Sequence, residues 1–329
     1  MTTPITRRTG LRLLFSTISA SALSIPINSV RGQTNSEADW PQYRFDAANT
    51  GYAPENTGPD PPLQAQWSFQ AGDIAKAPVV SGETVYIGSE SGTIYALRTD
   101  GTEKWSYQNN TNSAVTAPAV YNDTVYFGTV GWSVYGLNAE TGEQQWKVKT
   151  EGNVTASPTI SDDVVYVGCR DNNLYAFDSS TGEKEWQFET GDQIWAAPAV
   201  HNGTVYVGSK DNFLYAIDKQ TGEMQWRAET ESGITSAPAI ADDTVYVSGS
   251  ALGSKIKAIN ITDGSRRWVS EFDVSSEPAI RNETIYVGYS TMENGESWSG
   301  VLAVDRTDGT ERWRFETNND VYAAPVVTD

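Results

Sequence analysis

The sequence predicts an all-β protein, a β-propeller of four-stranded antiparallel blades with six complete blades and an incomplete seventh. Two observations predict this fold. Marker residues recur about every 40 positions, the tyrosines and the first six prolines in steps of 40 and the tryptophans in steps of 38 to 45, and the runs between turns alternate with a period of two. A helical solenoid would need a period near 3.6 within each repeat, and a leucine-rich horseshoe would need leucine ladders. The markers are Pro78, Pro118, Pro158, Pro198, Pro238, Pro278 and Pro325, Tyr86, Tyr126, Tyr166, Tyr206, Tyr246 and Tyr286, and Trp67, Trp105, Trp146, Trp186, Trp226, Trp268 and Trp313.

One repeat shows how the four strands follow one another. Residues 197–200 and 204–208 are β-branched runs separated by an Asn-Gly turn, which is typical of a hairpin. Residues 213–217 and 223–228 form the next two runs, separated by a Thr-Gly turn. Four antiparallel strands in 40 residues account for one propeller blade.

The repeats do not add up to a whole number of blades, because the seventh unit is incomplete. Trp67 begins an outer strand, six complete units follow, and residues 324–327 begin a seventh unit. If the ring closes, the last blade combines this inner strand with the Trp67 strand and lacks its two middle strands. Three explanations stay open: a shortened gene product, a contribution from residues 40–45 to the gap, or a strand edge left open for pairing.

The N-terminus is typical of an export signal. Residues 1–32 contain four arginines and no acid, with Arg7-Arg8 preceding a modestly apolar stretch from Leu11 to Val30. We therefore expect a twin-arginine signal peptide over 1–32, cleaved near Gly32, then an N-terminal extension over 33–66 and the propeller over 67–329. The expected location is outside the cell or at its surface, with no transmembrane span in the mature form.

The charge balance excludes polyanionic partners. The chain has 23 basic and 42 acidic residues and a net charge of −19, so we expect no binding to nucleic acid. An acidic, lysine-poor surface stays hydrated in concentrated salt, which indicates a halophilic, haloarchaeal source. Cys169 is the single cysteine, so no intramolecular disulfide forms and stability must come from packing.

Residues 176–186 have the form A-x-D-x-x-T-G-x-x-x-W, which recurs at 216–226 and in looser copies elsewhere. This motif resembles the tryptophan-docking motif of the PQQ-like (pyrroloquinoline-quinone repeat) propellers related to the assembly factor BamB, a family whose rings usually have eight blades. In such a motif the glycine supplies a turn with positive φ, and the broad indole packs between blades. The structural docking residues are Trp105, Trp146, Trp186, Trp226, Trp268 and Trp313.

The resemblance implies two functions. Quinoprotein dehydrogenases hold PQQ in the channel with calcium, a catalytic aspartate and commonly a vicinal disulfide, which one cysteine excludes here. The relatives of BamB present loops to protein partners. We therefore predict a noncatalytic extracellular scaffold, without cofactor or metal, that binds a protein or carbohydrate partner; the alternative is a PQQ-dependent, dehydrogenase-like quinoprotein using PQQ and calcium.

Other chemistries lack support in the sequence. His201 is the sole histidine and lies beside a hairpin turn without a visible nucleophile partner, so we predict no catalytic residue. Neither transition-metal nor EF-hand spacing is present, and no pair of carboxylates stands out as a glycosidase dyad.

The candidate ligand face is the one formed by the links between blades and the loops between second and third strands, called the loop face below. Aromatic and basic residues break the repeat symmetry there, where packing alone would favour the consensus residue. They suit a partner, although loop packing explains them equally well. The candidates are Trp132, Arg170, Trp195, Lys210, Phe213, Trp298 and Tyr322.

N-glycosylation signals occur at six positions, several of them at hairpin turns that favour asparagine in any case. Modification there would direct a partner toward the opposite face. The candidate sites are Asn109, Asn122, Asn153, Asn202, Asn260 and Asn282.

Overall fold

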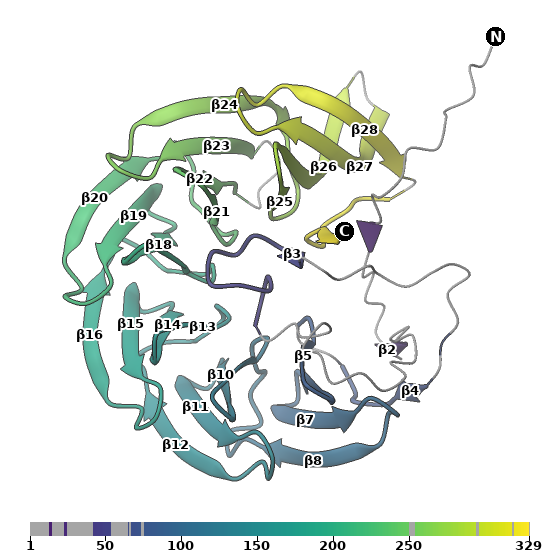
Figure 1. Ribbon diagram of the computed structural model, residues 1–329, viewed down its shortest axis with the longest axis vertical. Coiled ribbons are helices and arrows are strands. Elements are labelled where there is room, and N and C mark those ends of the chain that lie inside the picture. The colour runs from purple at the N-terminus through teal and green to yellow at the C-terminus, as the bar shows by residue number, and fades with distance from the viewer. Residues whose placement is uncertain are drawn as a thin grey trace.

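The protein is a ring of antiparallel β-sheets around a central channel, as the computed structural model shows (Figure 1). The structure describes residues 13–14, 23–24, 42–53, 65, 67–73, 76–249, 254–293, 296–317 and 319–328. Six four-stranded sheets follow one another in chain order, which confirms the predicted all-β propeller and its six complete blades. No helix that could span a membrane occurs in these described segments.

Each blade runs from a short inner strand at the channel to a long outer strand, in the sequence order of its strands. The 40-residue repeat sets these bounds, because each turn dipeptide recurs at the same place. Blade 1 is β5 (Val79–Ser81), β6 (Thr84–Gly88), β7 (Thr93–Arg98) and β8 (Glu103–Gln108); blade 2 is β9 (Ala119–Tyr121), β10 (Thr124–Thr129), β11 (Ser133–Asn138) and β12 (Gln144–Lys149); blade 3 is β13 (Thr159–Ser161), β14 (Val164–Gly168), β15 (Asn173–Asp178) and β16 (Lys184–Glu189).

The second half of the ring repeats this plan, with a longer outer strand in blade 5 and a longer central hairpin and outer strand in blade 6. Blade 4 is β17 (Ala199–His201), β18 (Thr204–Gly208), β19 (Phe213–Asp218) and β20 (Met224–Glu229); blade 5 is β21 (Ala239–Ala241), β22 (Thr244–Val247), β23 (Lys255–Asn260) and β24 (Arg266–Asp273); blade 6 is β25 (Ala279–Arg281), β26 (Thr284–Glu293), β27 (Glu296–Asp305) and β28 (Glu311–Thr317).

The core lies between neighbouring blades, where each indole contacts the turn of the next blade. Trp105 Nε1 donates to Ala139 O at 2.9 Å, and Tyr86 from the same blade donates its hydroxyl to the same carbonyl at 3.2 Å. Gly142 lies against the Trp105 ring with φ of +74°, so no side chain separates turn and indole. The same contact recurs around the ring through Trp146, Trp186, Trp226 and Trp268.

The two strands that flank the gap in the ring belong to different sheets. The inner strand β29 (Val326–Thr328) pairs in parallel with β3 (Tyr52–Ala53) and antiparallel with β1 (Leu13–Leu14). The outer strand β4 (Ser68–Phe69) pairs with β2 (Leu23–Ser24). Trp67 nevertheless docks onto blade 1 like the other tryptophans, because its Nε1 donates to Thr99 O at 2.8 Å.

Residues 42–53, called the channel segment below, cross the centre of the ring (Figure 1). Their oxygens accept backbone N–H groups from the inner strands at positions one repeat apart, which places the segment in the channel and not in the gap between blades. Trp40 and the cleavage position near Gly32 lie outside the described residues. The bonds are Ile160 N to Gln42 Oε1, Val200 N to Ala47 O, Ile240 N to Ala48 O, Ile280 N to Thr50 O and Val327 N to Gly51 O, at 3.1, 2.6, 2.9, 2.8 and 3.1 Å.

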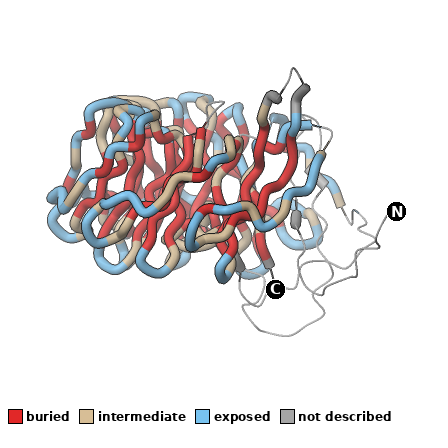
Figure 2. Tube along the Cα trace, turned by 90° about the horizontal axis from the view of Figure 1, so that it is seen from above, coloured by how far each residue is buried: buried red, intermediate tan, exposed pale blue. Residues whose placement is uncertain are grey.

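Burial follows the layers of the propeller. Figure 2 shows buried strands in the middle of the ring and exposed turns on its two faces. Val125, Val165, Val205 and Val245 on the second strands are fully buried, since both faces of each sheet are covered by neighbouring blades. Only the loops and the outer strands are therefore available to a partner.

Candidate functional site

An exposed indole between two cations forms the centre of the candidate site. Trp195 lies in the link between β16 and β17 and is 36% exposed. Arg170, in the β14–β15 loop, has its Cζ 4.0 Å from the centroid of the Trp195 ring, and Lys210, in the β18–β19 loop, has its Nζ 4.4 Å from it. Contacts of this kind between cation and ring hold all three side chains together on the loop face.

Side-chain amides fix the orientation of this cluster. Trp195 Nε1 donates to Gln193 Oε1 at 2.8 Å, and the carbonyl of Gln193 accepts Lys210 N at 3.0 Å. Arg170 Nε donates to Thr155 Oγ1 at 3.2 Å. The cluster is therefore held by residues of four consecutive loops, from the β12–β13 link to the β18–β19 loop, which a single run of sequence does not reveal.

Trp132 continues the cluster into blade 2. It lies in the β10–β11 loop, is 53% exposed, and donates from Nε1 to Asn153 Oδ1 at 2.6 Å. The carbonyl of the same Asn153 accepts Arg170 N at 3.0 Å. The structure therefore joins Trp132, Asn153, Arg170, Trp195 and Lys210 into one surface across blades 2 to 4, called the aromatic–basic strip below.

The backbone of Trp132 is in an unfavourable conformation. Its φ is +62°, whereas the corresponding loop positions carry Asn172 at +73°, Asn212 at +72° and Gly92 at +92°. Asparagine and glycine tolerate this left-handed region, while a bulky aromatic residue there is an outlier. Strain of this kind is concentrated at functional sites, which favours a role for the exposed indole.

Phe213 lies beside the strip, on the outer side of the same loop. Arg227 Cζ is 4.6 Å from its ring centroid, and both residues line a cavity of about 480 Å³ between blades 3 and 4. Asp211 at the edge of this cavity accepts Gly191 N and the Tyr215 hydroxyl, at 2.7 and 2.6 Å. Burial and the hydrogen bond to Asp211 raise the pKa of Tyr215 to about 12, so it remains a neutral donor.

Tyr322 belongs to a different part of the loop face. It is 66% exposed, its hydroxyl donates to Asp320, and it lines a cavity of about 610 Å³ at the channel. Arg44 and Glu277 line the same cavity, and the Arg44 guanidinium donates to Pro278 O. The channel segment thus supplies part of the wall of this cavity.

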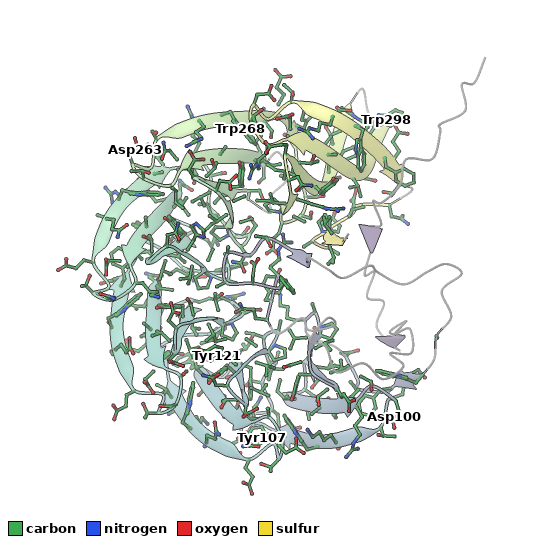
Figure 3. The ribbon with its side chains drawn as sticks, in the orientation of Figure 1. Asp100, Tyr107, Tyr121, Asp263, Trp268 and Trp298 are labelled. Carbon is green, nitrogen blue, oxygen red and sulfur yellow. The ribbon has the colours of Figure 1, made fainter. Side chains whose placement is uncertain are left out.

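Trp298 is also remote from the strip. It is 39% exposed and pairs with Thr291 in the long hairpin of blade 6. Figure 3 shows it across the ring from Tyr121 of blade 2. The residues predicted for the ligand face therefore lie in three separate places: the aromatic–basic strip with Phe213 beside it, the cavity lined by Tyr322, and the hairpin of blade 6 that carries Trp298.

The single cysteine is enclosed beneath the strip. Cys169 is fully buried, and burial raises the pKa of its thiol to about 12. Burial alone would raise the pKa of the adjacent Asp171 carboxyl, but hydrogen bonds from Cys169, Asn173 and Tyr175 hold it below its usual range. The thiol therefore stays protonated and unreactive in the folded protein.

The glycosylation candidates differ in exposure. Asn122, Asn202 and Asn282 are exposed and have positive φ values of 44°, 45° and 50°, while Asn153 and Asn260 are half-buried. Asn109 is fully buried, and its Nδ2 donates to Ser113 O at 2.7 Å, so a glycan does not fit there in the folded chain.

His201 is half-buried at the end of β17, and neither of the two cavities contains it. Within the described segments, no group of three or more histidine, cysteine, aspartate or glutamate side chains is arranged to hold a metal ion.

The chain matches one known protein family over most of its length. A family model described as "Outer membrane protein assembly factor BamB" matches residues 64–136, 112–195 and 189–329. The chain belongs to this family. The predicted resemblance to the BamB-related, PQQ-like propellers is thereby confirmed. No curated protein sequence matches the chain significantly.

Solved structures share the fold of this BamB-family chain at low sequence identity. BamB from Moraxella catarrhalis is 21% identical with a TM-score of 0.67, covering 79% of this chain and 82% of its own. Quinohemoprotein alcohol dehydrogenase from Comamonas testosteroni is 15% identical with a TM-score of 0.71, covering 85% and 67%. A europium-containing methanol dehydrogenase is 15% identical with a TM-score of 0.71, covering 89% and 80%. Such likeness shows the fold alone.

Sequence reasoning missed the residues that connect the site. Asn153 is predicted only as a glycosylation site and Gln193 is not among the predicted site residues, yet each links a tryptophan to a cation. Arg44 was not singled out, although it is buried in the channel and pairs with Glu277 at 3.9 Å. An arginine within an otherwise uncharged stretch before Asp46 was the only signal available.

Proposed function

We propose that this BamB-family protein is a noncatalytic, exported propeller scaffold that docks a protein partner on its loop face. The aromatic–basic strip carries the proposal, because exposed tryptophan and arginine are the residues most enriched at the energetic centres of protein interfaces. Secretion by the twin-arginine route and a haloarchaeal source belong to the same proposal, supported by Arg7-Arg8 and by the net charge of −19.

A PQQ-dependent activity does not fit the residues of the channel. The resemblance puts the quinone inside the ring, where the channel segment bonds to the inner strands of blades 3 to 6 and to β29. Cys169 has no second cysteine with which to form a vicinal disulfide. The likeness to two dehydrogenases at 15% identity supports a common fold and no common chemistry.

Site-specific cross-linking tests the proposed scaffold. A photoreactive phenylalanine replaces Val130, which is 38% exposed beside Trp132, and in a control variant it replaces Thr221 on the opposite face. In surface fractions of the source cells, we expect a protein adduct from position 130 and none from position 221. An adduct only from position 221, or from neither position, would overturn the proposal. An adduct sensitive to glycosidases but not to proteases would assign a carbohydrate partner instead.

A further inference from the structure

The two cations of the strip are set apart because both lie over one exposed indole, that of Trp195. The protein contains 42 acidic and 23 basic residues. In the described part of the chain, Arg170 and Lys210 make no ion pair and instead contact the Trp195 ring. Many other cations are paired, as in Lys104–Glu140, Lys219–Asp162, Arg266–Glu231, Arg267–Asp243, Arg306–Asp242 and Arg312–Asp305.

Asp171 and Asp211, which follow the two cations in the sequence, and Asp192 accept hydrogen bonds from their own and the neighbouring loops. Asp171 accepts Glu151 N, Asn173 N and the Tyr175 hydroxyl. Asp211 accepts the equivalent bonds from Gly191 N, Phe213 N and the Tyr215 hydroxyl. Asp192 accepts Gln193 N at 2.7 Å. These carboxylates shape the loops, and none of those in the described residues forms an ion pair with Arg170 or Lys210, so both cations can pair with an external anion.

The two cations are close enough to each other to be reached by alternate residues of an extended chain. Both charges lie close to one indole centroid, at 4.0 and 4.4 Å, which keeps them less than about 9 Å apart. Side chains at i and i+2 on one face of a β-strand are separated by about 7 Å. Two carboxylates at i and i+2 could therefore meet Arg170 and Lys210 together, with the residue between them turned away from the strip.

We propose that the aromatic–basic strip binds an extended acidic segment of the partner protein, with carboxylates at alternate positions on Arg170 and Lys210 and an apolar side chain against Trp132. This inference rests on the proposed scaffold function and names the chemistry of its partner. The acidic surface around the strip repels such a segment, so the strip is the place where it gains attraction.

A peptide is favoured over an acidic polysaccharide by the shape and composition of the strip. Sugar sites are concave pockets with convergent polar groups, whereas the strip extends along five loops and lines neither of the two cavities described above. Exposed Val130, beside Trp132, adds an apolar contact that suits a peptide side chain.

Binding of two matched peptides tests the inference. A fluorescent ten-residue peptide with a central Glu-x-Glu is titrated against the full chain and compared with the same peptide carrying Gln-x-Gln. We expect at least tenfold tighter binding of the Glu peptide, and at least a tenfold loss in the double variant Arg170→Gln/Lys210→Gln. The matched control is Lys147→Gln/Lys184→Gln. It removes two cations on the outer strands β12 and β16 that lie over the rings of Tyr135 and Tyr175, and this variant should bind the Glu peptide as tightly as the parent protein does.

The possible results separate this inference from the scaffold function. Equal affinity for both peptides, no binding of the Glu peptide, or unchanged binding by the Arg170/Lys210 variant would overturn the acidic-segment proposal. Binding of polygalacturonate in place of the Glu peptide would also overturn it. If the cross-link from position 130 persists in the Arg170/Lys210 variant, the scaffold stands and only the acidic segment fails. If position 130 yields no adduct in the parent protein, the scaffold function itself fails.

Discussion

At the scale of single residues, Trp132 combines an unfavourable backbone conformation with an exposed indole in the aromatic–basic strip. Its indole is half exposed and its backbone adopts φ of +62°, where two other repeats carry asparagine. A left-handed conformation costs a residue with a Cβ about 1–2 kcal/mol. Neither burial nor backbone preference favours tryptophan there, so the reasons that remain are its hydrogen bond to Asn153 and the proposed contact with a partner.

Replacing this residue should therefore separate stability from binding. We expect Trp132→Asn to stabilise the fold by about 1 kcal/mol, because asparagine relieves the left-handed strain, and to weaken partner capture at least tenfold. Thermal unfolding and cross-linking from position 130 measure the two effects. Asn172→Trp is the reverse control and should destabilise. A Trp132→Asn variant that is less stable than the parent would show that the strain argument is wrong.

At the scale of the element, each blade is joined to the next by one recurring geometry. The ladder between the third and fourth strands shifts register at the same place in every blade, as between Ala176 and Phe177 in blade 3. Ala176 pairs with Trp186 at this bulge, and the bulge directs the indole out toward the next blade, where its Nε1 donates to Lys219 O. Gly222 then lies flat against the ring.

Two glycines allow the indole contact to be measured apart from backbone strain. Gly222 and Gly203 both have positive φ, +72° and +78°, but a Cβ on Gly222 would lie 2.9 Å from Trp186, whereas one on Gly203 meets nothing within 4 Å. We expect Gly203→Ala to cost about 1 kcal/mol from strain alone and Gly222→Ala to cost at least about 1 kcal/mol more. Denaturant unfolding gives both values. An equal loss of unfolding free energy in the two variants would show that the turn can shift away from the indole to accommodate the added methyl group.

At the scale of the whole molecule, the channel segment connects blades that are distant in sequence. One stretch of twelve residues accepts N–H groups from five inner strands, and Asn49 Nδ2 adds a bond to Pro198 O at 2.9 Å. Asn49 is fully buried, so its bond is shielded from water. The ring is thereby held from the inside as well as by its indoles.

Amide hydrogen exchange can test this coupling. We expect Asn49→Ala to cost about 1–2 kcal/mol and to accelerate exchange at Val200, Ile240 and Ile280 together, since one segment protects all three. Val120 is the internal control, because no described residue of the segment bonds its amide. The exposed Asn110→Ala is the matched variant and should change nothing. Acceleration confined to one blade would contradict the idea of a single coupling segment.

The sequence by itself determined the repeat and the strand pattern. These follow from local rules: turn dipeptides set hairpins, period-two alternation sets strands, and a 40-residue step places equivalent residues at equivalent positions. The sequence also showed where residues differ from the consensus of the repeat, as at Trp132, Arg170, Trp195 and Lys210.

Only the tertiary structure decided which of these breaks belong together and where residues 42–53 lie. Loops that are 40 residues apart in the chain become neighbours when blades pack side by side, so Asn153 can join Trp132 to Arg170 while Trp298 is left across the ring. The channel segment has no repeat partner in the sequence. Its position depends on inner-strand N–H groups that converge from several blades, and such convergence exists only once the ring has formed.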